Sequence, residues 1–396
     1  MVILKENVFI IAIEFKKMKI KSIDVGAILN SINEETVEVT VNNIFKASTG
    51  GDGGFNKIIK ENPGKDISLE FLNKILNKGL IGYNLETLKD ILEIEEILLS
   101  YDKTNELSKL GGNVLLSLEF ALLKLISNNN PISVLNKSPD KFPLHICNCA
   151  ITNFNDKKIM HQEIILIPNT KKFSDSLFAN FYVYRRLGNI LKVNERNDEG
   201  AFITNMKNEN VFFALEKLTT EVTKKLGIDF SFGLNVNSSG IYSNGFYKSG
   251  KESFLVKDHL QDINKLVNRF DITYLEDPLS EENINLSGKL KTDFLCGNRA
   301  FGNNLENLKK YAKYFNCAVL KVNELGSLGR LKKIVEFCKN NDISLVMGQT
   351  LGDTNETILS DLVVGFEFDF IKSGLYGKER LQKLNEIKRL ESEFVI

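Results

Sequence analysis

The sequence predicts an α/β protein in which an N-terminal α+β cap is followed by a β/α barrel. From about residue 131 onward, apolar runs alternate with amphipathic segments such as 305–314 and 329–338, which is typical of a parallel sheet flanked by helices. Several of these runs end in a polar residue at nearly even spacing. Before residue 131 the pattern is different, because an alternating strand is followed by helical segments.

The first third of the chain has its own signals. Residues 36–41 (TVEVTV) alternate apolar and polar side chains, which predicts a half-exposed antiparallel strand. Segments 88–99 and 114–126 are helical in pattern, and the second is apolar on nearly every side, so we expect it to be buried. The run NNNP at 128–131 ends this helix and indicates a domain boundary. We therefore place the cap at 1–135 and the barrel at 136–396.

Six polar residues close apolar runs in the predicted barrel: Asn235, Glu276, Asn298, Lys321, Gln349 and Lys372. From Asn298 to Lys372 the steps are 23, 28 and 23 residues, about one strand plus one helix each. The carboxyl ends of barrel strands meet at one mouth, where active sites lie. Two lysines, a glutamate and amides at this mouth indicate a pocket for an anionic ligand. Carboxylates would be expected in place of the amides if the site held a metal ion.

Composition excludes several classes of partner. Lys plus Arg equals Asp plus Glu at 51 each, so no global positive field favours nucleic acid or acidic lipid. The five cysteines are odd in number and lie in apolar runs, which indicates buried free thiols in a reducing cytoplasm. The apolar run at 8–13 is too short to span a bilayer and lacks a signal-peptide cleavage site, so we expect it to form an extra strand. We expect either Met1 or Met18 to be the first residue of the translated protein.

The charged residues at the expected mouth have two interpretations. A lysine near a second cation loses proton affinity and can serve as a base, whereas a lone strand-end lysine usually pairs with a neighbour. Finding Lys321 and Lys372 on two strands of one barrel favours the functional interpretation. Glu163 and Glu276 also lie on strands, and Glu276 either binds metal or pairs with a lysine. Glu199 lies in a polar loop, where acids are normally uninformative.

Other motifs carry less information. The glycine-rich segment 50–54 lacks the ending of a phosphate-binding loop, so we expect a flap over the mouth. The three histidines have no ligand spacing, so neither a His-centred metal site nor a triad is expected. Gly326-Ser327-Leu328-Gly329 is expected to cap a helix.

Taken together, the segments resemble enolase from about residue 20 to 393. ILNS followed by TVEV is similar to the family's ILDSRGNPTVEV, and LGGN followed by SL is similar to LGANA and SLA. Three further motifs each carry a glutamate: QE at Glu163 matches QEF, NDEG at Glu199 matches GDEGG, and EDP at Glu276 matches EDP. KVNELGSL at Lys321 matches KVNQIGTL, GDTNET resembles GETEDT, and IKSG with ERLQKLN resembles IKTG with ERLAKLN.

The resemblance implies an α+β cap on a modified TIM-type barrel whose first strands are not all parallel. It also implies the reversible dehydration of 2-phosphoglycerate to phosphoenolpyruvate, a carbon–oxygen lyase reaction of glycolysis. By this resemblance Lys321 is the base, Glu199 the general acid assisted by Glu163, and Lys372 a contact of the substrate carboxylate. The resemblance also implies Mg²⁺, which acts together with such a base in the enolase superfamily.

The resemblance fails where the family binds metal and phosphate. The three carboxylates that hold the catalytic Mg²⁺ match Asn235, Glu276 and Asn298, and an adjacent aspartate matches Arg299. At the position of the family motif SHRSGE this chain has GQTLGD. Gln349 therefore replaces the histidine of the motif, and the phosphate-binding arginine and the following serine are replaced as well. The flap serine loop is shortened, and the loop at 150–155 lacks its glycine–histidine signature.

Two hypotheses follow. The first is an enolase-like pseudoenzyme with a degenerate magnesium site, which binds a small carboxylate or phosphorylated acid or acts as a partner or scaffold subunit. In it Lys321, Lys372 and Arg299 balance three glutamates without metal. The second is a working Mg²⁺-dependent enolase that completes the coordination of Glu276 with amide and substrate oxygens. Either would be cytoplasmic, bind neither nucleic acid nor membrane, and form a homo-oligomer, a dimer or higher.

Overall fold

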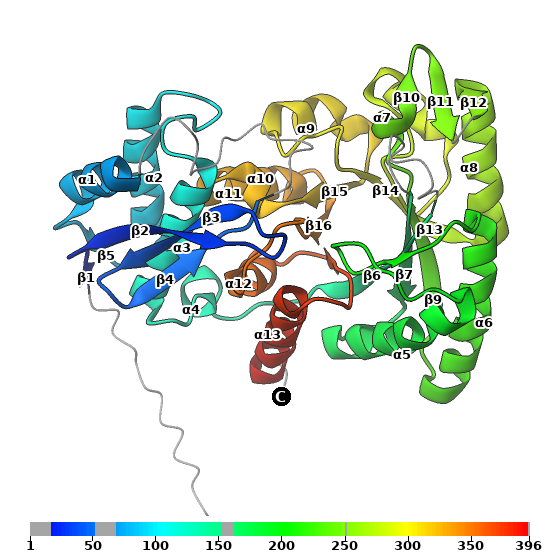
Figure 1. Cartoon of the computed structure of the whole chain (residues 1–396), viewed down its shortest axis with the longest axis horizontal. Helices are drawn as coiled ribbons and strands as arrows, with labels where there is room; N and C mark the ends of the chain where they lie inside the picture. The colour runs from blue at the N-terminus through cyan, green and yellow to red at the C-terminus, as the bar shows by residue number, and fades with distance from the viewer. Residues whose placement is uncertain (1–16, 52–68, 153–161, 250–251, 395–396) are drawn as a thin grey trace, which may run out of the picture.

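A three-stranded antiparallel sheet and a group of helices form the N-terminal part of the structure. The computed structural model describes residues 17–51, 69–152, 162–249 and 252–394. The sheet contains β2 (Ile23–Leu29), β3 (Glu35–Val41) and β4 (Phe45–Ser48), in that order. The expected antiparallel strand at 36–41 is therefore confirmed as β3. Figure 1 shows this sheet and its helices to one side of the barrel.

The helices of this part pack beside the sheet. They are α1 (Leu69–Leu80), α2 (Leu88–Asp102), α3 (Gly112–Ser127) and the short α4 (Ile132–Leu135), and the two-residue strands β1 (Met18–Lys19) and β5 (Asn84–Leu85) pair antiparallel. Helix α3 is buried along its length except at Lys124, as its apolar sequence predicts. It ends at Asn128, whose φ of 52° places it in the left-handed region that commonly terminates helices.

Eight strands close the barrel. They are β6 (Leu144–Thr152), β7 (Gln162–Pro168), β9 (Phe230–Asn235), β13 (Ile272–Glu276), β14 (Phe294–Gly297), β15 (Cys317–Leu320), β16 (Ser344–Gly348) and β17 (Phe370–Lys372), and β17 pairs with β6 to complete the circle. β7 runs antiparallel to β6 and β9, whereas the other pairs are parallel. The modified barrel implied by the resemblance is confirmed.

Helices and short elements surround these strands. The helices are α5 (Phe173–Leu191), α6 (Asn208–Leu226), α7 (Ser238–Ile241), α8 (Val256–Phe270), α9 (Leu305–Tyr311), α10 (Val322–Leu325), α11 (Leu328–Lys339), α12 (Ile358–Gly365) and α13 (Lys378–Phe394). The short elements are β8 (Phe202–Ile203), β10 (Tyr242–Ser243), β11 (Phe246–Ser249), β12 (Glu252–Leu255) and the 3₁₀ turns η1 (Glu281–Lys289) and η2 (Ala312–Tyr314). The helix expected at 305–314 changes to a 3₁₀ turn after Tyr311.

The reversed direction of β7 decides where its first residues lie. Glu163 is the second residue of β7, and it pairs in register with Asn235, the last residue of β9. Because β7 is antiparallel to β9, its amino end lies at the rim where the parallel strands have their carboxyl ends. We call this rim the mouth. A glutamate near a strand start thus joins residues that lie at strand ends.

Some sequence expectations fall outside the described residues. The apolar run at 8–13 lies there, as do most of the glycine-rich segment and residues 153–155 of the second loop. All five cysteines are described, buried and free of disulfide bonds, as expected. Within the described ranges, no helix has both the length and the apolar character needed to cross a membrane.

The cap and the barrel meet at the N-terminus of α11. Ser327 caps this helix through a bond from Arg330 N, which confirms the expected capping role of the segment. Two buried carboxylates from cap helices bind the same turn. Glu95 accepts from Ser327 Oγ at 2.6 Å and Gly329 N at 2.7 Å, and Glu119 accepts from Leu328 N at 2.8 Å. A Cβ at Gly329 would lie 2.5 Å from Glu95 Oε2, so any other residue would displace this carboxylate from the helix N-terminus.

Burial makes one of these carboxylates retain its proton. Desolvation, followed by the nearby charge of Glu95, raises the pKa of Glu119 well above its ordinary value of 4.5, and Arg330 only partly opposes this. Glu119 Oε1 has no hydrogen-bond partner among the described residues, whereas a proton on this atom would let it donate to Glu95. The folded chain therefore binds a proton that the unfolded chain releases above about pH 4.5. As pH rises above this value, Glu119 lowers the free energy of unfolding.

We predict that Glu119→Gln stabilises the protein at alkaline pH. The amide supplies permanently the hydrogen that the carboxyl must otherwise retain, so we expect a gain on the order of 1 kcal/mol at pH 8 that shrinks toward pH 4. Urea unfolding across this pH range measures it. Glu96→Gln, at an exposed site on α2, is the matched control and should change stability by less than about 0.5 kcal/mol. A gain of the same size at every pH would contradict the assignment.

Candidate functional site

The centre of the mouth is an ion-pair cluster around Lys372. Its ammonium lies 2.8 Å from both carboxylate oxygens of Glu276 and 3.1 Å from Glu163 Oε2. The three side chains come from β17, β13 and β7, so three separate parts of the barrel bring them together. Glu276 is completely buried and Lys372 is 9% exposed.

Two amides and a phenol complete the hydrogen bonding of the two glutamates. Asn235 Nδ2 donates to Glu163 Oε2 at 3.0 Å, and Asn298 Nδ2 donates to Glu276 Oε1 at 2.9 Å. Tyr274 Oη donates to Glu276 Oε2 at 2.7 Å. A carboxylate has about four acceptor positions, and Glu276 fills all of them with Lys372, Asn298 and Tyr274. We refer to Glu163, Asn235, Glu276, Asn298 and Lys372 as the mouth cluster.

Opposite charges in the cluster hold each other ionised. Burial by itself would lower the pKa of Lys372, but Glu163 and Glu276 outweigh it and raise that pKa above its ordinary value. Burial by itself would raise the pKa of Glu163, but Lys372, with Asn235, lowers it below its ordinary value. The two shifts agree, so a salt bridge and not a shared neutral pair occupies the centre of the mouth.

The donor set of the mouth cluster does not fit a magnesium ion. Mg²⁺ requires oxygen ligands in near-octahedral geometry. Both asparagines present nitrogen to the glutamates, and the reverse orientation would set an amide oxygen against a carboxylate. Asn235 Oδ1 already accepts from Asn237 N at 3.1 Å. In the described part of the chain, no three His, Cys, Asp or Glu side chains are grouped to hold a metal.

Lys321, the expected base, has an acidic partner that the sequence did not reveal. It follows β15, and its ammonium lies 3.2 Å from Glu324 Oε1 on α10; the two side chains are 16% and 8% exposed. Asn303 fixes this pair, because it accepts from Lys321 N at 2.9 Å and donates to Glu324.

Glu199 lies next to the same charges, in the loop between α5 and β8. Burial, and then the charge of Glu163, raises the pKa of Glu199 to about 7, while Lys321 and Lys372 partly oppose the rise. The neighbouring loop is held by Tyr184 Oη, which donates to Gly200 O at 2.5 Å. Gly374, two residues after Lys372, touches the Glu199 carbonyl so closely that a Cβ would lie 2.0 Å away.

Arg299 does not join the mouth cluster, contrary to the expectation that it balances the three glutamates. Its backbone N–H donates to Asp277 Oδ2 at 3.0 Å, and its charge lowers the pKa of that residue. Burial and the charge of Glu276 still raise the pKa of Asp277 to about 6. The reason is geometric, because Arg299 follows Asn298 directly and successive residues point in different directions.

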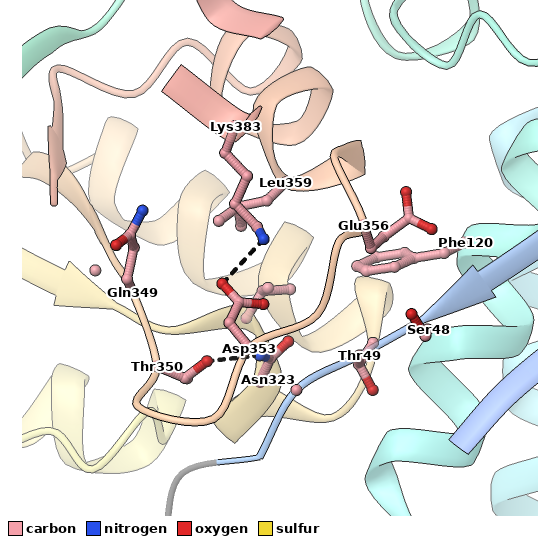
Figure 2. A pocket seen from close by; sticks show the side chains of 13 residues that line it. Ser48, Thr49, Phe120, Asn323, Gln349, Thr350, Asp353, Glu356, Leu359 and Lys383 are labelled. Carbon is pink, nitrogen blue, oxygen red and sulfur yellow. Dashed lines mark hydrogen bonds and ion pairs between the residues drawn. The ribbon is translucent and has the colours of Figure 1, made fainter. Parts of the chain in front are cut away.

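Gln349, the last of the expected site residues, follows β16 and lines a small pocket beside the mouth (Figure 2). The structure thus places all eight candidates at or next to one rim: Glu163, Glu199, Asn235, Glu276, Asn298, Lys321, Gln349 and Lys372. Sequence reasoning missed Tyr274 and Glu324. Tyr274 was detectable, because it lies two residues before Glu276 on one strand and so shares its face.

We predict that removing the central cation destabilises the fold. Lys372→Met leaves the fully buried Glu276 without a counter-charge, which typically costs about 3–5 kcal/mol, measured by urea unfolding at pH 7. Lys141→Met is the control, since its 2.8 Å pair with Asp369 is half exposed and should contribute less than about 1 kcal/mol. Adding Glu276→Gln to Lys372→Met should recover part of the loss. Equal, small effects of both lysine variants would contradict the assignment.

Comparisons with known proteins agree with this geometry. Residues 143–395 match the family model described as enolase, C-terminal TIM barrel domain. The chain is 26% identical to an enolase of Archaeoglobus fulgidus over 394 residues, covering 94% of this chain and 97% of that protein. It is 28% identical to an enolase of Ehrlichia ruminantium over 413 residues, covering 94% and 96%. The family match spans well over half of the sequence and coincides with the closed barrel. The chain therefore belongs to the enolase family.

Proposed function

We propose that this protein has lost efficient dehydration of 2-phosphoglycerate and that its mouth binds a small carboxylate. The observation that carries the proposal is the position of Lys372, whose ammonium lies between Glu163 and Glu276 at 2.8–3.1 Å. Asn235 and Asn298 donate to the same glutamates. The carboxylates of Glu163 and Glu276 therefore already have hydrogen-bond donors within the protein. A divalent ion would have to displace Lys372 and reverse two amides before it could bind.

The free energy that a metal ion supplies to the transition state is large enough for its loss to lower the rate strongly. Metal stabilisation of a concentrated negative charge in a transition state is typically worth several kcal/mol. Each loss of about 1.4 kcal/mol lowers the rate tenfold. One ammonium that is already neutralised by two carboxylates supplies little of this stabilisation. Retention of an acid and a base cannot replace it.

The pairing of Lys321 supports the same proposal. A general base must be unprotonated before the reaction, and in this structure a carboxylate oxygen of Glu324 lies 3.2 Å from the Lys321 ammonium. The family motif KVNQIG has a neutral glutamine where this chain has Glu324. The substitution therefore adds a negative charge next to the residue that would remove the proton.

A working Mg²⁺-dependent enolase is the second candidate, and one observation favours it. Glu199 has a pKa of about 7, which suits a general acid at neutral pH. Lys321, Lys372 and Glu163, the other residues that the resemblance assigns to the reaction, lie close enough to affect that pKa. In this candidate, Mg²⁺ would supply charge stabilisation, and Glu276 with the amide oxygens of Asn235 and Asn298 would have to hold it.

The remaining proposals concern assembly and location. We propose a cytoplasmic homo-oligomer, in keeping with the resemblance to enolases. A scaffold or partner-subunit role is consistent with a folded barrel that lacks the chemistry. Sedimentation velocity of the purified chain distinguishes a monomer from a dimer or a larger assembly.

We predict that the purified protein forms phosphoenolpyruvate from 2-phosphoglycerate at no more than about a thousandth of a typical enzyme rate of ~10 per second, even at millimolar Mg²⁺. Absorbance of the enol product measures it, with the Archaeoglobus fulgidus enolase as positive control. Glu324→Gln should raise any residual rate by removing the negative charge beside Lys321, and Lys321→Ala should abolish it. A wild-type turnover of roughly 1–1000 per second would establish the second candidate instead.

We also predict that restoring carboxylates creates a metal site. Asn235→Asp combined with Asn298→Asp removes two amide donors and adds two anionic oxygen ligands, so we expect Mn²⁺ affinity to rise at least about a hundredfold. Paramagnetic resonance of free Mn²⁺ measures it. Asn340→Asp combined with Asn341→Asp, two exposed positions after α11, adds the same charge away from the mouth and should leave Mn²⁺ binding unchanged. Tight Mn²⁺ binding by the wild type would contradict the premise.

A further inference from the structure

A cavity lies where the cap meets the barrel next to α13. It is lined by residues at the end of α3 and just after it, by the start of α12 and by the second half of α13. α4 packs against α12, and α12 packs against α13 (Figure 1). The cavity has a volume of about 230 Å³, which holds roughly seven water molecules at ~30 Å³ each. We call it the α13 cavity, and none of its described lining residues belongs to the mouth cluster.

Asp361, on α12, is the buried carboxylate of this cavity. The residue is 5% exposed, and its Oδ1 accepts from Ile132 N at 3.1 Å. Its Oδ2 accepts no hydrogen bond from the described residues, yet it is not one of the unpaired atoms that the protein encloses completely. Because Asp361 lines the cavity, this second oxygen is open to it. A nearly buried carboxylate with one empty oxygen favours a ligand that brings a donor or a positive charge.

Lys124 lines the same cavity but pairs with a different carboxylate. It is the only cation among the described lining residues. Its ammonium lies 2.7 Å from Glu356 and 2.8 Å from Lys46 O. Glu356 also accepts from Thr357 N at 2.9 Å, at the N-terminus of α12. The lining cation and the positive end of α12 therefore both face Glu356, and neither forms a hydrogen bond with Asp361.

Two further carboxylates and two helix ends make the cavity negative. Glu386 and Glu393, both on α13, line it. Glu386 pairs with Arg389, whereas no described residue forms an ion pair with Glu393. Asn129 follows the C-terminus of α3, and Glu393 lies in the last turn of α13. Both helices therefore present the negative ends of their dipoles here, which favours a cation.

The same surroundings make Asp361 difficult to ionise. Burial, and then the charge of Glu386, raises the pKa of Asp361 to about 7, with a smaller contribution from Glu356. The bond from Ile132 N partly opposes the rise. Near neutral pH about half of the molecules carry a proton on this carboxyl, and a cation that binds there must displace it. Cation binding should therefore tighten as pH rises through 7.

We propose that the α13 cavity binds a small aliphatic amine in its cationic form, with the ammonium on Asp361 and the carbon chain against Leu390 and Pro131. An ammonium has three donors, enough for Asp361 Oδ2 and the acids of α13. A bare divalent ion fits less well, because in the described part of the chain no three His, Cys, Asp or Glu side chains are grouped to hold a metal. The site is independent of the chemistry of the mouth.

Calorimetry on the full chain tests the ligand class with putrescine, a four-carbon diamine that keeps its charge between pH 6 and pH 8, at constant ionic strength. At pH 8 we expect a dissociation constant below about 1 mM. At pH 6 the affinity should be about tenfold weaker, because most Asp361 carboxyls are then protonated. 1,4-Butanediol, which has the same chain without charge, should not bind. No detectable putrescine binding at millimolar concentration, or equal affinity at both pH values, would overturn the proposal.

Asp361→Asn tests the residue itself. Its amide oxygen can still accept from Ile132 N, so the variant should fold and melt no lower than the wild type without ligand. Putrescine binding at pH 8 should weaken at least about tenfold and lose its pH dependence. Asp342→Asn is the matched control and should change neither value, because this exposed residue has a φ of 52°, which asparagine also adopts.

Two outcomes of these titrations would assign the cavity differently. Unchanged putrescine affinity in Asp361→Asn would show that the ammonium does not bind this carboxylate. Displacement of putrescine from the wild type by an equal concentration of Ca²⁺ would show that the cavity prefers a metal ion to an amine. Either result contradicts the proposal.

Discussion

The buried carboxylate of Glu276 is the constraint on which the rest of the site depends. A fully buried negative charge is tolerated only if it is paired and hydrogen-bonded. Lys372 supplies the charge, and Asn298 and Tyr274 supply the remaining bonds. In a barrel that used metal, the ion would neutralise this carboxylate. Here the protein neutralises it with its own lysine, and under the function we propose this lysine stands where a metal ion would supply positive charge.

The architecture explains how residues at the mouth can differ between family members while the fold stays intact. Each member of the mouth cluster lies at the end of a different strand or just beyond it, where side chains change without altering barrel closure. The reversed β7 brings Glu163 to the same rim as Asn235. The cap binds the barrel elsewhere, at the first turn of α11, through Glu95 and Glu119.

Much of the fold was predictable from the sequence, because periodicity reports which faces are buried. The alternation in β3, the all-round apolar character of α3 and the polar residues ending β9, β13 and β17 predicted the two parts and the mouth. The contacts of the charged side chains could not be predicted, because the sequence does not show which group a given lysine, arginine or carboxylate will contact. The pairing of Lys321 with Glu324 was not visible in the sequence, nor was the contact between the Arg299 backbone and Asp277. Glu119, in an apolar helix, gave no sign of its bond to α11.

The most direct test is the location of metal in crystals of the wild-type protein soaked in millimolar Mn²⁺, read from anomalous scattering. The account predicts no anomalous peak among Asn235, Glu276 and Asn298, with the Lys372 ammonium remaining within hydrogen-bond distance of both Glu276 oxygens. An ordered manganese ion bound to Glu276, with Lys372 displaced from it, would contradict the central claim and restore metal-dependent chemistry to this mouth.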